Sequence, residues 1–232
     1  MNVSLVPEGA RVADIGCDHG YASIWLIENG IADRVIATDS NRGPIERAKE
    51  HICRYGLDKQ IECRQGDGLE KLIPGEVDTL MIAGMGGPLM MRILDAGKEV
   101  VERIRTLVLQ PQSEIGAVRK YIIEAGFSIN REKICLEDGK YYFALLAEKS
   151  EEPGTEVFDS EWKFRYGIGL IQEKNPVMKQ YLERERNTYV SILGNAGWKG
   201  KAHEKKAGIE RRIHEIDECL EKMETCGKGL VE

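Results

Sequence analysis

The sequence predicts an α/β fold with a doubly wound, mostly parallel, Rossmann-like sheet of seven strands, followed by a C-terminal helical hairpin of the coiled-coil type. Short apolar runs alternate with helical patterns through roughly the first 150 residues, as in parallel sheets. A turn containing glycine joins the first run to a helix, and apolar residues recur at heptad spacing after Pro176. With 232 residues, 42% of them hydrophobic, the chain can hold one such domain and a smaller appendage.

Five apolar runs are expected to form parallel strands, and a closing pair is expected to form an antiparallel hairpin. The turn Glu137-Asp138-Gly139-Lys140 supports the hairpin, because Asp-Gly between two strand-like runs favours a tight reversal. Five parallel strands closed by such a hairpin are typical of class I methyltransferases rather than of dehydrogenases. The predicted strands are Val12–Ile15, Val35–Thr38, Ile61–Arg64, Val77–Ala83, Thr106–Leu109, Ser128–Leu136 and Tyr141–Glu148.

The turn after the first strand indicates the cofactor. Dinucleotide enzymes use Gly-x-Gly-x-x-Gly, which is absent, whereas the looser acid-x-Gly-x-x-x-Gly of S-adenosylmethionine (SAM) methyltransferases fits Asp14, Gly16 and Gly20. Asp18, within the same turn, would repel a pyrophosphate but tolerate a sulfonium. The alternative is a tight bend with a purely structural role.

Two acids follow the next two strands. Asp39 comes nineteen residues after Gly20, where an acid of this fold binds the ribose hydroxyls. Asp67, in Arg64-Gln65-Gly66-Asp67-Gly68, is expected to accept a hydrogen bond from the adenine amino group, with Gly68 supplying a backbone N–H. The alternative is a Gly-Asp-Gly turn in which Asp67 caps the next helix.

The fourth and fifth strands end in segments expected to receive the substrate. Ala83-Gly84-Met85-Gly86-Gly87 is predicted to form the floor of the substrate pocket, with Met85 as an apolar contact. A loop that merely packs closely on the sheet is the alternative. In Gln110-Pro111-Gln112 two amides are placed to read a base edge.

The segment Glu151-Glu152-Pro153-Gly154 is expected to separate two domains, residues 1–152 and 153–232. Beyond it, two helices joined by a turn over 194–200 are predicted to bury one apolar seam. The same seam could pair two chains, although a monomer is favoured. Its residues are Met178, Leu182, Tyr189 and Leu193 on one helix and Ile209, Ile213, Ile216, Leu220 and Met223 on the other.

Charge is distributed unevenly along the chain. The net charge is −6, yet the stretch from Lys163 to His214 holds twelve Lys or Arg and five Asp or Glu. A basic appendage on an acidic body favours nucleic acid as a partner, the alternative being a solvated helical face. The residues expected to be exposed near the tip of the helical hairpin are Lys199, Lys201, Lys205, Lys206, Arg211 and Arg212.

Other classes of protein are disfavoured. No apolar run is long enough to span a bilayer and no signal peptide precedes the first strand, so a cytoplasmic location without membrane contact is expected. The six cysteines form no Cys-x-x-Cys pair, which argues against a metal site and against disulfides.

Five motifs in order, DIGCDHGY, RQGDGL, IAGMGG, LQPQ and DGKYYFALLAEK, closely resemble the bacterial tRNA (adenine-22-N1)-methyltransferase family over nearly the whole chain. The resemblance implies a SAM-dependent enzyme that methylates N1 of adenine 22 in the D-arm of tRNA, with the helical appendage helping to hold the tRNA. With the turn and strand-end residues, it gives a set of expected cofactor contacts: Asp14, Gly16, Asp18, His19, Tyr21, Asp39, Ser40, Asp67, Gly68, Ala83 and Gly84.

Three features depart from the family pattern. An amphipathic N-terminal helix expected in this family does not precede the first strand. Gln112 stands where the family pattern has Asn, and Asp39 stands where some members have Glu.

The chemistry expected for such an enzyme depends on alignment more than on proton transfer. Asp18 is expected to stabilise the cationic product, and His19 to orient Asp18 or to bind the methionine end of SAM. The alternatives are a SAM-dependent methyltransferase of another substrate, such as a small molecule, a protein or another RNA, and a non-catalytic SAM-binding adaptor.

Overall fold

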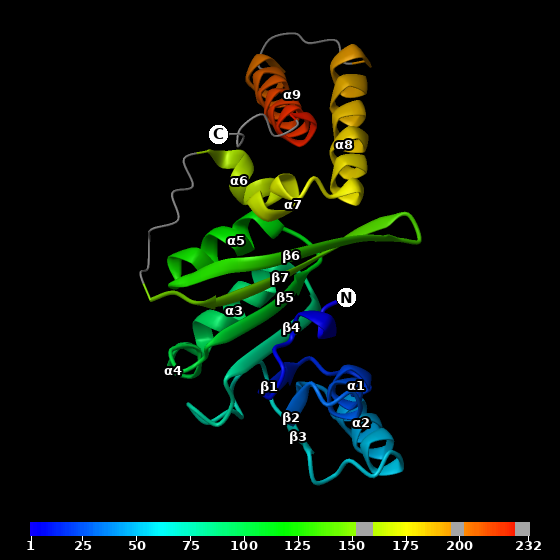
Figure 1. The fold of residues 1–232 in the computed structure, drawn as a ribbon, viewed down its shortest axis with the longest axis vertical. Coiled ribbons are helices and arrows are strands. Elements are labelled where there is room, and N and C mark those ends of the chain that lie inside the picture. The colour runs from blue at the N-terminus through cyan, green and yellow to red at the C-terminus, as the bar shows by residue number, and fades with distance from the viewer. Residues whose placement is uncertain (152–159, 196–201, 226–232) are drawn as a thin grey trace, which may run out of the picture. The chain divides into compact units, whose positions relative to one another are not determined.

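The computed structural model describes residues 1–151, 160–195 and 202–225 (Figure 1). The chain divides into two compact units. Unit 1 comprises Met1–Lys133 and Tyr142–Val157, and unit 2 comprises Ile134–Tyr141 and Phe158–Glu232. The predicted boundary at residue 152 falls in a segment outside the described residues, so the two-domain division at that position stays a prediction.

A seven-stranded sheet is the frame of the fold, with the order β3-β2-β1-β4-β5-β7-β6. The pairs β1–β2, β1–β4, β2–β3 and β4–β5 are parallel, and β7 pairs antiparallel with β5. The predicted mostly parallel, doubly wound sheet is therefore confirmed. The strands are β1 (Ala10–Ile15), β2 (Ala32–Asp39), β3 (Ile61–Gln65), β4 (Thr79–Met85), β5 (Thr106–Pro111), β6 (Phe127–Glu137) and β7 (Lys140–Lys149).

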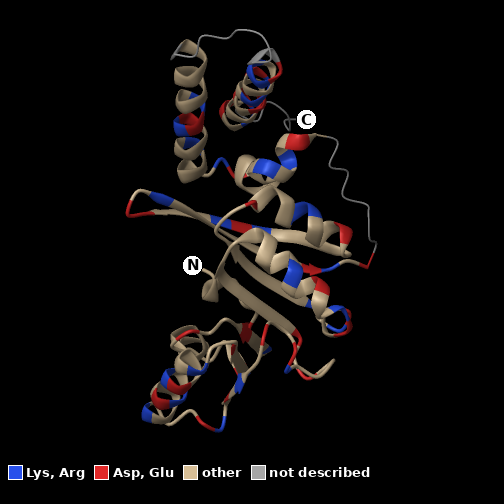
Figure 2. Ribbon diagram, turned by 180° about the vertical axis from the view of Figure 1, so that it is seen from behind, with Lys and Arg blue, Asp and Glu red and all other residues tan. Residues whose placement is uncertain are grey.

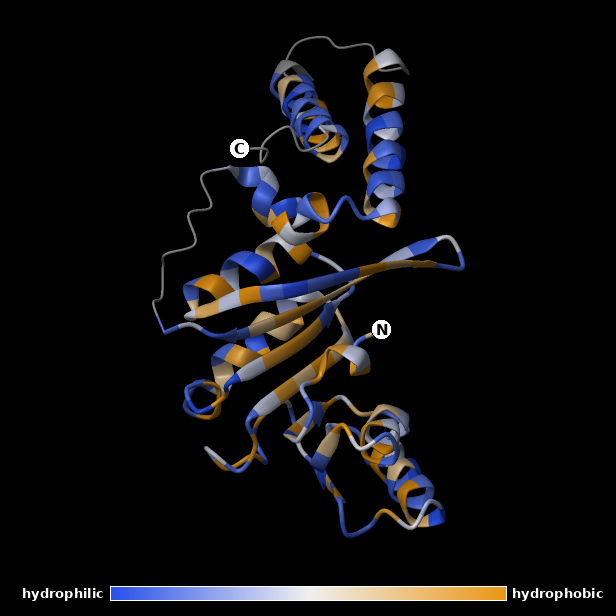
Figure 3. Ribbon diagram, viewed as in Figure 1, coloured by the Kyte–Doolittle hydropathy of each residue, from blue (hydrophilic) through white to orange (hydrophobic). Residues whose placement is uncertain are grey.

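Helices cover both faces of the sheet, because its central strands are apolar on both sides (Figure 3). Val12 and Val108 pack with one set of helices, whereas their neighbours Ala13 and Leu109 pack with the other. The first set is η1 (Val3–Leu5), α1 (Tyr21–Glu28) and α2 (Arg42–Arg54). The second set is α3 (Gly87–Ala96), α4 (Lys98–Val101) and α5 (Ile115–Glu124).

The reversal between β6 and β7 has the predicted two-residue form. Asp138 and Gly139 have φ angles of 49° and 74°. Positive φ at both central residues defines the type I′ turn that suits the twist of a hairpin. The outer part of this hairpin, Ile134–Tyr141, belongs to unit 2, where Arg184 donates a hydrogen bond to the Gly139 carbonyl at 3.0 Å.

Unit 2 is built around two long helices, α8 (Pro176–Asn195) and α9 (Ala202–Glu224), which pack against each other as predicted. The seam residues Met178, Leu182, Ile209, Ile216 and Met223 are buried. In the C-terminal half of α9, Cys219 is fully buried while its neighbour Leu220 is only half-buried. Gly194 and Asn195, expected in the turn, lie within α8, and residues 196–200 of that turn fall outside the described residues.

Two short helices of unit 2, α6 (Glu161–Tyr166) and α7 (Ile168–Gln172), were not predicted. Both pack against α9, and they bury Trp162, Tyr166 and Leu170. Helices of five or six residues contain too few turns to show a periodic pattern in the sequence.

None of the described helices is both long and apolar enough to cross a lipid bilayer. Among the described residues no group of three or more His, Cys, Asp or Glu side chains could hold a metal ion. The five described cysteines are all free thiols.

Candidate cofactor and substrate site

A cavity of about 260 Å³ opens at the carboxyl ends of β1, β2, β3 and β4, where ligands bind in open parallel sheets. Eight of the predicted site residues line it, together with six that the sequence did not single out. The predicted ones are Gly16, Asp39, Ser40, Asp67, Gly68, Ala83, Gly84 and Met85, and the others are Ile15, Thr38, Asn41, Gly66, Leu89 and Ile93.

The turn after β1 brings its backbone to the cavity. Gly16 has a φ of 74°, which a residue with a side chain rarely adopts. The N–H groups of Gly16 and Cys17 both donate to the Thr38 carbonyl, at 2.8 and 2.9 Å. A Cβ atom on Gly16 would also meet the Met85 Cε atom, the end of a flexible side chain, so the positive φ is the stronger reason for a glycine here.

Asp14 lies beneath this turn and does not line the cavity. It is 4% exposed and accepts a hydrogen bond from the Ser23 hydroxyl at 2.6 Å. Burial raises the pKa of Asp14 to about 6, the charge of Asp39 adds to this, and the Ser23 hydrogen bond opposes it. The geometry thus gives Asp14 a supporting position, tying the start of α1 to β1.

Asp39 reaches the cavity from the end of β2. One carboxylate oxygen accepts the backbone N–H of Asn41 at 2.8 Å. Next to it, the buried Thr38 hydroxyl has no hydrogen-bond partner among the described residues. The Asp39 carboxylate at the cavity wall suits a ligand with two adjacent hydroxyl groups.

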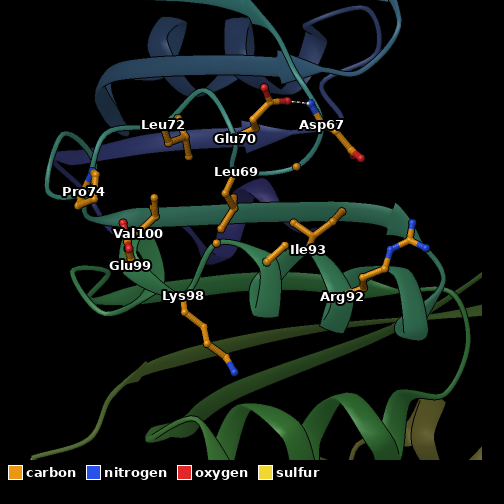
Figure 4. A pocket seen from close by; sticks show the side chains of 13 residues that line it. Asp67, Leu69, Glu70, Leu72, Pro74, Arg92, Ile93, Lys98, Glu99 and Val100 are labelled. Carbon is orange, nitrogen blue, oxygen red and sulfur yellow. Dashed lines mark hydrogen bonds between the residues drawn. The ribbon is translucent and has the colours of Figure 1, made fainter.

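Asp67 and Gly68 form the cavity wall after β3. Gly68 has a φ of 54°, and a Cβ atom there would lie 3.0 Å from the Ile93 side chain. The Asp67 N–H faces the Glu70 carboxylate at 3.4 Å (Figure 4). No helix lies between β3 and β4, whose connection is fully described, so the alternative in which Asp67 caps a following helix is wrong.

These features fit SAM. The described residues that line the cavity include two carboxylates and no Lys or Arg, so the cavity disfavours a pyrophosphate and tolerates a cation. Leu89 and Ile93 supply apolar surface beside the acid expected to meet the adenine. Asp39 and Ser40 supply polar groups for the ribose.

The loop after β4 is held by the end of β5. Gly84 donates its N–H to the Gln110 side-chain oxygen at 2.8 Å, and Gln112 donates its own to the Met85 carbonyl at 2.8 Å. Gln110 is 7% exposed, so it orders this loop instead of facing solvent, whereas Gln112 is exposed. The side chain of Pro111, between them, is buried.

The two glycines after Met85 allow close packing. A Cβ atom on Gly87 would lie 2.5 Å from the Ser113 carbonyl oxygen, and one on Gly86 would lie 3.2 Å from the Ser113 hydroxyl. The close-packing alternative for this segment therefore holds at Gly86 and Gly87, while Gly84 and Met85 face the cavity.

Asp18, His19 and Tyr21 lie outside the cavity lining, on the turn that continues from Gly16. Asp18 has a φ of 49° and is exposed, with its carboxylate 3.6 Å from the His19 ring. The sequence did not single out His51 of α2, whose ring packs with those of His19 and Tyr21. It is 32 positions from His19, and no motif connects the two.

A larger hollow of about 710 Å³ lies beside the cofactor cavity and shares Asp67, Gly68 and Ile93 with it. Part of its lining is apolar and consists of Leu69, Leu72, Ile93 and Val100 (Figure 4). Arg92, Lys98, Glu70 and Glu99 add charges of both signs. The mixed lining favours no particular ligand.

The basic residues predicted for the tip of the helical hairpin have different surroundings. Lys205 and Arg211 are exposed, and Lys206 pairs with Glu210 at 3.4 Å. Arg212 is half-buried over the Tyr189 ring and 3.8 Å from Glu215, so its expected exposure is wrong. Along α9, most Lys and Arg lie in the N-terminal half and most Asp and Glu in the C-terminal half (Figure 2). Lys199 and Lys201 lie outside the described residues.

The model of the tRNA (adenine(22)-N(1))-methyltransferase family, TrmK, matches residues 12–218. The chain belongs to this family. A tRNA (adenine(22)-N(1))-methyltransferase of Bacillus subtilis strain 168 is 36% identical over 185 residues, 79% of this chain and 78% of that protein. The family expected from the motifs is therefore confirmed.

Solved structures agree over almost the whole length. The crystal structure of the B. subtilis m1A22 tRNA methyltransferase TrmK has a TM-score of 0.84 at 32% identity, covering 94% of this chain and 95% of that one. Streptococcus pneumoniae Sp1610, crystallised in complex with S-adenosyl-L-methionine, has a TM-score of 0.83 at 30% identity, covering 94% and 96%.

Proposed function

We propose that this protein transfers the methyl group of SAM to N1 of adenine 22 in the D-arm of tRNA. One observation carries the proposal: a member of the tRNA (adenine(22)-N(1))-methyltransferase family has, at its sheet edge, a cavity with two carboxylates and no Lys or Arg among the described lining residues. Both the charge and the position suit a sulfonium cofactor.

The cofactor is held by groups from four loops. Asp39, with Ser40, binds the ribose hydroxyls; Asp67 and Gly68 bind the adenine; the turn at Gly16 receives the methionine part. Ala83 and Gly84 complete the wall, and Asp14 supports the turn from below. When bound, SAM supplies an electrophilic methyl group on its sulfonium.

The target nitrogen already carries a lone pair in the plane of the ring. Its lone pair forms the new N–C bond while the bond from the methyl carbon to sulfur breaks, and the electron pair of that bond stays on sulfur. No proton has to move for this step. The protein therefore contributes mainly by positioning the base, which must leave its stack to reach the cavity. Gly84 and Met85 face the cavity, and exposed Gln112 adjoins this loop.

The methylated adenine carries a positive charge, which a nearby carboxylate stabilises. Asp18 is the exposed carboxylate on the turn, with the His19 ring beside it. We expect Asp18→Asn to lower kcat about tenfold or more while SAM affinity is kept, whereas Asp58→Asn, an exposed control, leaves both unchanged. Full turnover in Asp18→Asn would show that Asp18 has no part in the chemistry.

Unit 2 provides a basic surface for the tRNA backbone. Lys205, Lys206 and Arg211 are the described members, and Lys199 and Lys201 are proposed to add to them. Because the apolar seam of α8 and α9 is filled within one chain, the protein is proposed to be a monomer, acting in the cytoplasm where tRNA is found.

The test is methyl transfer from labelled SAM to unmodified tRNA transcripts, followed by mass spectrometry of the nucleosides. We expect 1-methyladenosine in transcripts with adenine at position 22 and none when that base is guanine. Methylation of both transcripts, or of neither by a protein that binds SAM, would refute the assignment.

A further inference from the structure

Three aromatic rings lie together where the turn after β1 meets α2. The ring centroids of Tyr21 and His51 are 4.9 Å apart, and His19 lies 5.8 Å from Tyr21 and 5.9 Å from His51. The three ring planes are within 29° of one another. These nearly parallel rings from two separate segments form one stacked aromatic cluster, which we call the ring platform.

His51 holds the ring platform together. Its Nδ1 atom is 3.0 Å from the His19 carbonyl oxygen. A carbonyl only accepts, so Nδ1 must be the donor, and this fixes the orientation of the His51 ring. The hydrogen bond ties α2 to the turn that carries Asp18 and His19.

The platform is open to solvent on the side of Tyr21, and cations lie on the helix that carries His51. Tyr21 is 60% exposed, far more than a core aromatic residue. Arg47 and Arg54 stand four residues before and three after His51, so helical spacing places them on the same side of α2, and both are exposed. The helix carries four Lys or Arg and two Glu in a chain whose net charge is −6.

We propose that His19, Tyr21 and His51 form a stacking platform for an unpaired nucleobase of the bound RNA. The inference deepens the proposed function and rests on it. An RNA strand from which one base has been flipped offers unstacked bases to aromatic side chains, and cations beside the rings attract its phosphates. Gly16, at the other end of the same turn, lines the cofactor cavity, so a stacked base would sit beside the reaction site.

Variants at two positions separate stacking from anchoring. Tyr21→Ala removes a ring and Tyr21→Phe keeps it. His51→Phe keeps the ring without the donor, and His51→Gln keeps an N–H donor without the ring. Tyr55→Ala serves as the control, because Tyr55 caps the C-terminal end of α2, is 50% exposed and makes no ring contact with the platform.

The readouts are KM for tRNA, kcat, and the fluorescence of 2-aminopurine placed at the target position or at either flanking position, since stacking quenches this base. Loss of one stacked base corresponds to a rise in KM of about tenfold. We expect that rise, and loss of quenching at one position, in Tyr21→Ala and His51→Gln. Tyr21→Phe and Tyr55→Ala should stay within about twofold of wild type, and His51→Phe should keep the quenching.

Unchanged KM and unchanged quenching in both Tyr21→Ala and His51→Gln would overturn the platform, as would an equal loss in Tyr55→Ala. SAM affinity and thermal melting establish that each variant is folded, and a variant that fails this check is replaced by Tyr21→Ser or His51→Asn. Failure of the proposed function looks different: the wild-type protein itself would not methylate the adenine 22 transcript, whatever the fluorescence shows.

Discussion

Charged side chains are used differently at the carboxyl edge of the sheet and in the helices of unit 2. At the sheet edge Asp39 and Asp67 have no Lys or Arg partner within the described part of the chain. In unit 2, by contrast, several acidic side chains of α9 form ion pairs with Lys or Arg. These pairs are Arg165–Glu215, Arg186–Asp217 and Lys179–Glu224. Charges that hold the structure are neutralised internally, and charges left without a partner are available to a ligand.

The most deeply buried ion pair among the described residues lies in unit 1. Arg119 of α5 and Glu132 of β6 are almost completely buried, with Nε and Oε1 2.6 Å apart. Arg119→Met should lower the free energy of unfolding by about 3–5 kcal/mol, because Glu132 is left buried without its partner. Urea unfolding measures this. Lys120→Met, next along α5 but exposed, should cost less than about 0.5 kcal/mol; equal losses would refute the distinction.

Substitution of Asp39 should weaken ligand binding and leave stability nearly unchanged, the opposite of substitution of Arg119. Asp39→Asn removes a charge that has no Lys or Arg partner among the described residues and keeps an oxygen to accept the Asn41 N–H, so SAM affinity should fall by about tenfold to a hundredfold while thermal stability changes little. Calorimetric titration measures the affinity for SAM, and a melting curve measures thermal stability. The control is Asp33→Asn, an exposed acid on the same strand β2. A large loss of stability in Asp39→Asn would mean that this carboxylate is structural.

The shape of the cofactor cavity also depends on Gly16, which has no side chain. Gly16→Ala places a Cβ atom against the Met85 Cε atom at a positive φ, so SAM affinity should fall by about tenfold. Met85 has a flexible side chain, and Gly16→Ala/Met85→Ala should recover part of the loss by removing the clash. If the double variant binds SAM no better than Gly16→Ala, backbone strain and not the clash is responsible.

The sheet and the cavity could be predicted because their signals are local. Apolar runs give the strands, and glycines and acids directly after a strand must lie at the carboxyl edge of a parallel sheet, as Asp39 and Gly84 do. His51 could not be found in this way, since its position beside Tyr21 depends on how α2 crosses the start of α1. Arg212 was misjudged because heptad spacing gives the seam but not which flanking side chain folds over a ring.

The hydrogen bond from the Ser23 hydroxyl stabilises the buried Asp14 carboxylate, and removing it measures that contribution. Folding raises the pKa of Asp14 from about 4 to about 6, so its ionised form destabilises the folded state above pH 6, and this penalty fades as pH falls toward 4. Ser23→Ala removes a hydrogen bond to that carboxylate and should cost about 1–2 kcal/mol at pH 8 and less at pH 4.5. Unfolding at both pH values measures the difference, which should vanish in an Asp14→Asn background.

The smallest effect is expected on the surface of unit 2, where a few charges remain outside ion pairs. Lys205→Gln/Arg211→Gln should raise KM for tRNA severalfold at low salt and make it less dependent on salt, because two phosphate contacts are lost. SAM affinity should not change. Lys222→Gln, near the acidic end of α9 and paired with Glu218, is the control and should leave KM unchanged. If the control raises KM as much as the double variant, general electrostatic attraction accounts for the effect; if neither does, α9 does not hold the tRNA and its basic residues are only a solvated face.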